Sequence, residues 1–187
     1  MKVIIVTGTP STGKTTLSTK LAKKLDFHYI DVNKTVKKYK LSEGYDRKRK
    51  TKIVDVKKLN KALIKEVSII KSHIKKIYNN KNSKKIKNNN QKIKKGIIVD
   101  SHLSHYLPKK YVNLCIVTKC DLKVLKNRLN KKKYSKNKIR ENLDAEILDI
   151  CLNEAKENKH KVVVVDTTKG INIKKVLNNI NRLTKLK

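Results

Sequence analysis

The chain alternates between short unbroken apolar runs and longer segments in which apolar residues recur every three or four positions. An unbroken run, such as Val162 to Val165, is typical of a parallel strand buried on both faces. These runs predict strands over residues 2–7, 28–31, 96–100, 111–118 and 161–166. The periodic segments predict helices over residues 14–24, 56–77, 121–130, 136–158 and 173–185, with N-terminal caps at Asp121, Ser135 and Asn172. The alternation predicts one α/β domain with a parallel sheet.

The predicted helix over residues 56–77 has a single apolar stripe, which we expect to face the core. The stripe is formed by Leu59, Leu63, Val67, Ile70, Ile74 and Ile77. Residues 79–95, which follow, are polar and low in complexity. We expect this segment to form a mobile loop.

A phosphate-binding motif lies between the first predicted strand and the first predicted helix. Residues 8–15 read Gly-Thr-Pro-Ser-Thr-Gly-Lys-Thr, which is the pattern G-x-x-x-x-G-K-[ST]. In such a loop, Lys14 is expected to reach the β- and γ-phosphates of ATP, and the Thr15 hydroxyl is expected to bind Mg²⁺. The helix that follows directs the positive end of its dipole at the phosphates. The motif therefore predicts a nucleotide site.

A second nucleotide signal is the apolar run at 96–99 that ends in Asp100. An acid in this position commonly holds Mg²⁺, directly or through water. His102 lies two residues further on, where it could orient a water or contact the γ-phosphate; a structural or solvated histidine is an equal alternative. The other histidines are weaker candidates for chemistry: we expect His105 to be secondary, His28 and His73 to be structural, and His160 to lie on the surface.

The segment at 166–170 follows the last predicted strand. Ligands of parallel sheets gather at the carboxyl ends of the strands, so Lys169 could contact the base of the nucleotide. An ordinary turn between a strand and a helix explains the segment equally well.

The charge of the chain is extreme. Its 187 residues include 49 Lys and Arg but 15 Asp and Glu, which gives a formal net charge of +34. RNA is therefore a candidate partner through the basic stretches 47–52 and 81–95, although the codon usage of an AT-rich genome could also produce this composition. Cys115 and Cys151 have no metal-binding spacing and are expected to be buried in a reducing compartment. With no leader or membrane-spanning run in the sequence, we expect a cytoplasmic protein and no membrane partner.

The sequence resembles the atypical adenylate kinases of archaea and eukaryotes that act in maturation of the small ribosomal subunit. The resemblance covers nearly the whole chain except residues 79–95. It is carried by residues 8–16, 29–32, 42–46, 99–102, 128–129 and 134–147. The combination of Glu-Gly-Tyr-Asp at 43–46 with Asp-Ser-His at 100–102 is specific to that family, whereas the phosphate-binding motif alone is not.

The resemblance implies a three-layer P-loop nucleoside monophosphate (NMP) kinase fold with a five-stranded parallel sheet. A single domain over 1–187 would include an NMP-binding region at 31–54 and a short lid at 131–141. The implied nucleotide-binding residues are Ser11, Gly13, Lys14, Thr15, Thr16 and Lys132. The implied catalytic residues are Lys14, Asp100, His102, Arg128 and Arg140, with Thr15 and Asp100 at Mg²⁺.

The implied activity is phosphorylation of AMP or another NMP by ATP, together with a slower ATPase. The implied partner is a platform protein of the small ribosomal subunit, bound transiently near ribosomal RNA. A ribosome-assembly ATPase with incidental kinase activity remains an alternative, as does a P-loop kinase of another small metabolite.

The sequence departs from the family pattern at three places. Ser11 stands where the family usually has Gly, and a positive φ there would cost roughly 1 kcal/mol. Lys132 stands near a lid arginine of some relatives, and lysine cannot bind phosphate in a bidentate manner. The basic run at 47–50 replaces an often acidic stretch, which favours contact with RNA over the family's protein partner.

Overall fold

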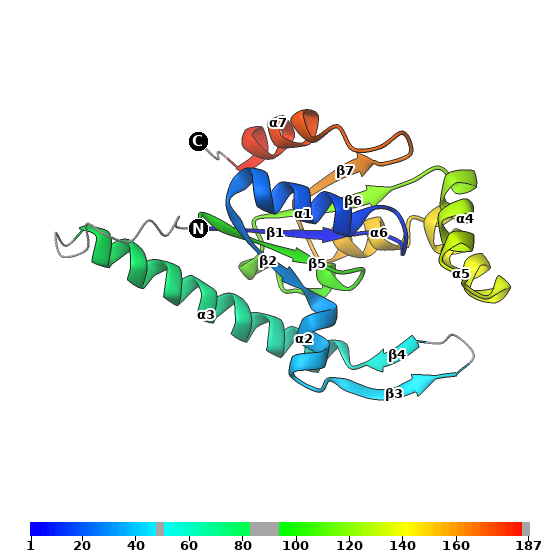
Figure 1. Cartoon of the computed structure of the whole chain (residues 1–187), viewed down its shortest axis with the longest axis horizontal. Helices are drawn as coiled ribbons and strands as arrows, with labels where there is room; N and C mark the ends of the chain where they lie inside the picture. The colour runs from blue at the N-terminus through cyan, green and yellow to red at the C-terminus, as the bar shows by residue number, and fades with distance from the viewer. Residues whose placement is uncertain (48–50, 83–93, 185–187) are drawn as a thin grey trace.

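The computed structural model describes residues 1–47, 51–82 and 94–184. Its centre is a five-stranded sheet in which every pairing is parallel (Figure 1). In spatial order the strands are β2 (Phe27–Asp31), β5 (Gly96–Asp100), β1 (Lys2–Thr7), β6 (Leu114–Lys119) and β7 (Val162–Asp166). This confirms the fold class that the apolar runs and the resemblance predict.

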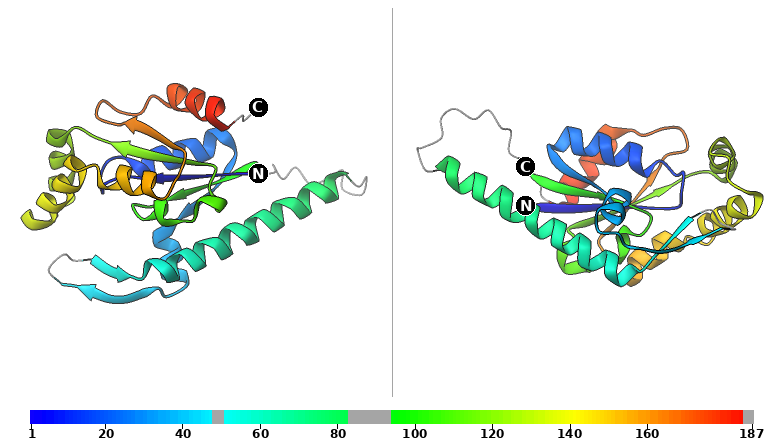
Figure 2. Two further views of the ribbon diagram at one scale, coloured as in Figure 1. Left: turned by 180° about the vertical axis from the view of Figure 1, so that it is seen from behind. Right: turned by 60° about the horizontal axis from the view of Figure 1, so that its bottom comes forward.

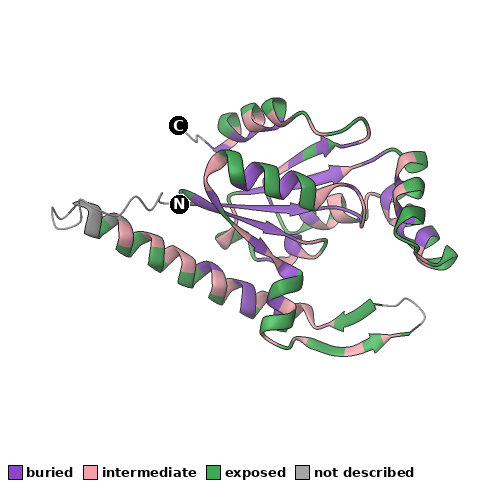
Figure 3. Cartoon of the chain, in the orientation of Figure 1, coloured by how far each residue is buried: buried purple, intermediate pink, exposed green. Residues whose placement is uncertain are grey.

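Helices cover both faces of the sheet and form the outer two layers. Because side chains alternate along a strand, Val3 and Ile5 of β1 face one layer while Ile4 and Val6 face the other. The helices α1 (Lys14–Leu25) and α7 (Ile173–Thr184) pack on the side of Ile4. The helices α3 (Val56–Asn82) and α6 (Ile150–Glu157) pack on the side of Val3. Figure 3 shows the resulting buried sheet between more exposed helices.

A pair of helices, α4 (Leu122–Lys131) and α5 (Lys136–Ile147), stands at the carboxyl ends of the strands (Figure 1). Leu125, Leu129 and Ile139 form their own small apolar core. The predicted caps are confirmed by side-chain oxygens that accept backbone N–H groups at the first turns. The donors are 2.9 Å from Asp121, 3.3 Å from Ser135 and 3.0 Å from Asn172.

The region between β2 and α3 contains elements that the apolar pattern does not predict. They are the short helix α2 (Val32–Lys38) and a hairpin of β3 (Ser42–Asp46) and β4 (Thr51–Val54). The hairpin stands away from the sheet and is largely exposed (Figures 2 and 3). Its strands lack an apolar face, which explains why the sequence gives little sign of them.

Other boundaries differ from the predictions. The predicted helix 136–158 is two helices, because the chain turns through Asp149 at a φ of 53°. The predicted strand 111–118 begins at Leu114, since Lys109–Tyr111 form a 3₁₀ turn. Helix α3 continues through residues 79–82, so that part of the expected loop is helical; residues 83–93 lie outside the described residues. Within the described ranges, no helix is long and apolar enough to span a bilayer.

Candidate active site

The phosphate-binding motif forms a tight loop between β1 and α1. Gly8 has a φ of 137°, and a Cβ at this position would lie 2.5 Å from the Thr118 carbonyl oxygen. Ser11 has a φ of 72°, a left-handed conformation that favours glycine. The departure at Ser11 therefore carries the strain of roughly 1 kcal/mol expected for a side chain in this conformation.

Lys14 folds back over this loop. Its ammonium donates to the carbonyl oxygens of Gly8 at 2.7 Å and Thr9 at 2.8 Å. Burial lowers the pKa of Lys14 to about 8, and nearby Asp100 opposes this lowering. The loop thus holds a desolvated cation where the motif predicts phosphates.

The Asp100 carboxylate lies beside the loop, because the register of β1 and β5 pairs Asp100 with Val6. The residue is 5% exposed. Its Oδ2 accepts a hydrogen bond of 2.9 Å from the Tyr29 hydroxyl. Its Oδ1 is buried and has no hydrogen-bond partner among the described residues. A buried carboxylate oxygen without a donor fits a cation ligand, and Mg²⁺ prefers oxygen ligands.

His102 lies in the loop after Asp100 and is exposed. The pKa of its imidazole is lowered from the usual value, first by partial desolvation and then by the Lys14 ammonium. His102 is therefore neutral at pH 7, and a ring nitrogen can accept or donate a hydrogen bond there. Thr15 and Thr16, at the start of α1, are exposed and available to a ligand.

Three of the remaining histidines differ from their predicted roles, and His105 does not. His105 is 1% exposed, with Nδ1 2.7 Å from Thr7 Oγ1 and Nε2 2.8 Å from Glu154 Oε2. His160, predicted on the surface, is buried, and its Nε2 lies 2.8 Å from the His105 carbonyl oxygen. Two predicted structural histidines, His28 and His73, are exposed. Sequence spacing gives no sign of these contacts, which join α6 to β1.

The predicted basic residues of the site differ in burial and in their contacts. Arg128 is half-buried and donates to the Thr167 carbonyl oxygen at 2.8 Å and to Thr167 Oγ1 at 3.3 Å. Arg140 is exposed on α5, and Lys169 is exposed in the loop after β7. Lys132, also exposed, is near enough to Lys14 to contribute to its lowered pKa.

One lysine that sequence reasoning missed also approaches the site. Lys138 lies in the first turn of α5 and contributes to the lowered pKa of His102. Its place one turn after the Ser135 cap is a signal that could have identified it. Tyr29 is a second missed residue, and its position in the quoted segment 29–32 gave no hint of the bond to Asp100.

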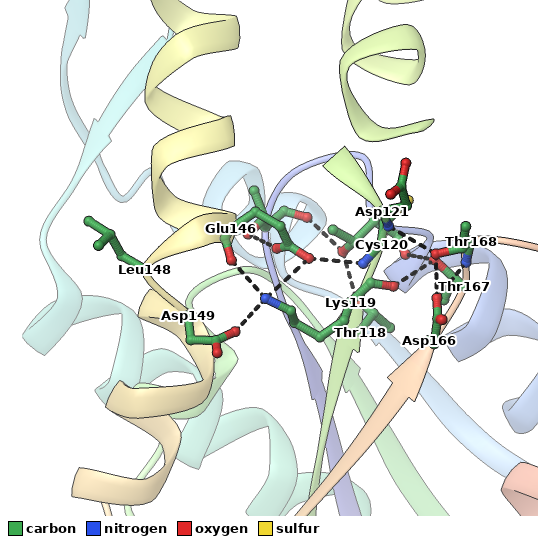
Figure 4. Close-up of polar contacts among 12 residues, drawn as sticks. Thr118, Lys119, Cys120, Asp121, Glu146, Leu148, Asp149, Asp166, Thr167 and Thr168 are labelled. Atoms are coloured by element: carbon green, nitrogen blue, oxygen red, sulfur yellow. Dashed lines mark hydrogen bonds and ion pairs between the residues drawn. The ribbon is translucent and has the colours of Figure 1, made fainter. Parts of the chain in front are cut away.

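The loop after β7 is joined to the phosphate-binding loop and to the start of α4 (Figure 4). Thr167 Oγ1 donates to the Thr12 carbonyl oxygen at 2.6 Å, and Thr168 Oγ1 accepts from the Asp121 N–H at 2.9 Å. Three loops at the carboxyl ends of β1, β6 and β7 are thereby joined by hydrogen bonds. This is the place where parallel sheets bind their ligands.

A phosphate-binding loop after the central strand, an acid at the end of the adjacent strand and a helical pair above them define a P-loop nucleotide kinase. A family model described as an AAA domain matches residues 4–149. A relative in Methanocaldococcus jannaschii, provisionally named an adenylate kinase, is 37% identical over 88% of this chain and 76% of its own length. The adenylate kinase isoenzyme 6 homolog of Schizosaccharomyces pombe is 32% identical over 97% of this chain and 89% of its own. The chain belongs to this adenylate kinase family.

Solved structures share the fold at low sequence identity. Deoxyadenosine kinase from M. mycoides, solved with bound dATP, has a TM-score of 0.53 and 16% identity, over 97% of this chain and 100% of its own. Shikimate kinase from Acinetobacter baumannii, solved with shikimate, has a TM-score of 0.54 and 14% identity, over 100% of this chain and 96% of its own. Because these two kinases act on different substrates, they support the fold alone.

Proposed function

We propose that this nucleotide kinase transfers the γ-phosphoryl group of Mg²⁺-ATP to AMP, and that it hydrolyses ATP slowly when AMP is absent. The observation that carries the proposal is that the Lys14 ammonium lies within electrostatic reach of Asp100, whose buried carboxylate has one oxygen without a donor among the described residues. A cation for phosphate and an acid for a metal ion lie beside each other at the carboxyl edge of the sheet. The relatives' names support adenylate chemistry.

Positioning and charge account for catalysis in this proposal. The backbone N–H groups of the loop containing Ser11 and Gly13 cradle the phosphates, and Lys14 moves from the loop carbonyls to the β- and γ-phosphates. Asp100 and the Thr15 hydroxyl would hold Mg²⁺, which supplies charge neutralisation on the phosphate oxygens. Neutral His102 orients the attacking group or a water.

In this proposal the helical pair and the hairpin move when the substrates bind. Residues 131–141 form the lid, and Lys132, Lys138 and Arg140 bring positive charge toward the transferring phosphoryl group. Residues 31–54 form the acceptor region. Next to it, a groove of about 340 Å³ lies between β2, α2 and α3, with charged side chains of both signs at its wall.

The test of this activity compares ADP formation with and without an acceptor. Purified protein receives Mg²⁺-ATP with AMP, CMP, UMP, GMP or shikimate, and ADP is measured. We expect AMP to accelerate ADP formation most. Lys14→Ala should abolish this activity, with a loss on the order of 10²-fold or more. The matched control is Lys20→Ala, which removes an exposed lysine from the same helix. Hydrolysis that no monophosphate stimulates would refute the kinase proposal.

A second candidate function is an ATP-dependent role in assembly of the small ribosomal subunit, through a platform protein and RNA, in the cytoplasm. The excess of cations, 49 against 15 acids, favours contact with RNA phosphates. On the hairpin, Arg47 and Lys52 are exposed. Capture of subunit components from an extract, with and without ATP, tests the protein partner.

The RNA contact has its own test, the affinity for a single-stranded RNA across a salt series. Phosphate contacts predict that log K falls with log salt by about 0.7 per neutralised phosphate. Arg47→Gln with Lys52→Gln should flatten this slope and leave ATP affinity in the absence of acceptor unchanged. An affinity that ignores salt would contradict the RNA contact.

A further inference from the structure

A buried carboxylate with no part in the chemistry above lies beneath the phosphate-binding loop. Glu146, near the end of α5, is 4% exposed. We propose that Glu146 is a positioning residue that holds Thr9 of the phosphate-binding loop to the base of the lid helices. The proposal rests on the ATP-dependent phosphoryl transfer proposed above.

The contact to the loop is direct. Thr9 Oγ1 donates a hydrogen bond of 2.5 Å to Glu146 Oε2. The carbonyl oxygen of the same Thr9 accepts from Thr12 N–H at 3.2 Å, from Thr12 Oγ1 at 2.7 Å and from Lys14 Nζ at 2.8 Å. Fixing Thr9 therefore fixes a carbonyl oxygen that the Lys14 ammonium contacts.

The other contacts of Glu146 reach the start of α4 and the end of α5 (Figure 4). Its Oε1 accepts from the Cys120 N–H at 2.9 Å, just before the Asp121 cap of α4, and lies 3.5 Å from Lys119 Nζ. Lys119 Nζ also donates to the Glu146 carbonyl oxygen at 2.7 Å and pairs with Asp149. Glu146 thus joins the loop, the start of α4 and the end of α5.

The charge of Glu146 makes these contacts hard to replace. Burying a carboxylate is costly unless donors surround it, and here the donors are one hydroxyl, one backbone N–H and one ammonium. Such a set fixes the direction of both carboxylate oxygens. A lid displacement that moves α5 would carry Thr9 with it, so the loop and the lid share one anchor.

The experiment uses the whole protein and separates the effect of the Thr9 hydroxyl from the effect of the side chain's volume. Thr9→Val removes the hydroxyl at nearly constant volume, and Thr9→Ser keeps it. We expect Thr9→Val to lower kcat about tenfold or more and to weaken Mg²⁺-ATP binding, while the KM for AMP changes less than twofold. Thr9→Ser should stay within about threefold of the unaltered protein in each quantity.

Further variants identify the partner of that hydroxyl. Glu146→Gln should resemble Thr9→Val, because both substitutions disrupt the hydrogen bond between Thr9 and Glu146. The double variant should therefore be no less active than the less active of the two single variants. The control is Asp149→Asn, which alters the same Lys119 but does not touch the loop and keeps a residue suited to a positive φ. It should retain activity.

The outcomes are distinct. Equal loss in Thr9→Ser and Thr9→Val, additive losses in the double variant, or loss in Asp149→Asn would each overturn the proposal. A lower thermal midpoint with kcat and ATP affinity intact would show a merely structural contact and also overturn it. ATP affinity is measured without acceptor, so the comparison of ATP affinities among the variants stays valid even if AMP is not the substrate. Failure of the kinase proposal would be seen separately, as a lack of stimulation by AMP in the unaltered protein.

Discussion

Lys14 should take up a proton when ATP binds at alkaline pH. In the free loop, burial lowers the pKa of its ammonium from 10.5 to about 8. The surrounding charges act in both directions: Cys151, Asp100 and Glu146 raise this pKa, and Lys132 lowers it. Bound phosphates favour the charged form, so the pKa of Lys14 must rise when ATP occupies the loop.

The sign and size of the effect follow from this difference. Below pH 8, Lys14 is charged in both the free and the bound protein, and ATP affinity does not depend on its titration. Above pH 8, the protein without ATP loses the proton that the complex retains, so ATP affinity falls with rising pH by up to about tenfold per pH unit until Lys14 of the complex also titrates. At pH 8 about half a proton should be taken up for each ATP bound.

Calorimetric titration with ATP in buffers of different ionisation enthalpy measures this uptake directly. At pH 8 and above, the ATP phosphates are fully ionised and do not contribute. Lys14→Arg keeps a guanidinium that stays charged, so it should abolish the uptake. Cys151→Ala should not reduce it, because loss of this group, which raises the pKa of Lys14, leaves no less of the lysine neutral before ATP binds. No uptake at pH 8, or the same uptake in Lys14→Arg, would show that Lys14 is not the titrating group.

Three substitutions test the rest of the site. Tyr29→Phe removes the donor to Asp100 and should weaken Mg²⁺ affinity of the ATP complex about tenfold, measured by metal titration; unchanged affinity would exclude this orienting role. His102→Ala should reduce turnover more than ATP affinity, and an equal fall in both would make His102 a binding residue. Arg128→Ala and Arg140→Ala should lower kcat for AMP phosphorylation more than ATP affinity; kinetics within twofold of the unaltered protein for both would remove them from the site.

The layered core could be predicted from the sequence because burial leaves a strong local pattern. Five apolar runs mark the five strands, and the motif at 8–15 fixes the loop between β1 and α1. The caps at Asp121 and Ser135 were equally visible, since a cap needs only the residues of its own turn. What these features share is that their physical causes lie within a few residues of one another.

The break between α5 and α6 could not be predicted in this way. The periodic pattern continues across it, and Asp149 is an ordinary polar residue in the sequence. In the structure, the ammonium of Lys119, 30 positions earlier, binds the Asp149 carboxylate and takes the Glu146 carbonyl oxygen as well. The break is stabilised by a contact between distant segments, for which one sequence holds no local signal.

The same reasoning explains why the polar residues beneath the loop gave no signal in the sequence, whereas the phosphate-binding motif did. A residue that meets phosphate belongs to a motif, because the ligand imposes fixed spacing, as between Gly8 and Lys14. A residue such as Glu146, which meets Thr9 across 137 positions, has no spacing to obey. It is visible only as a charge on a helix until the fold turns it inward. Residues that orient the loop without touching the ligand must therefore be sought among buried charged side chains whose hydrogen bonds are satisfied within the protein. Substitution of such a residue tests whether it positions the loop or takes part in the reaction.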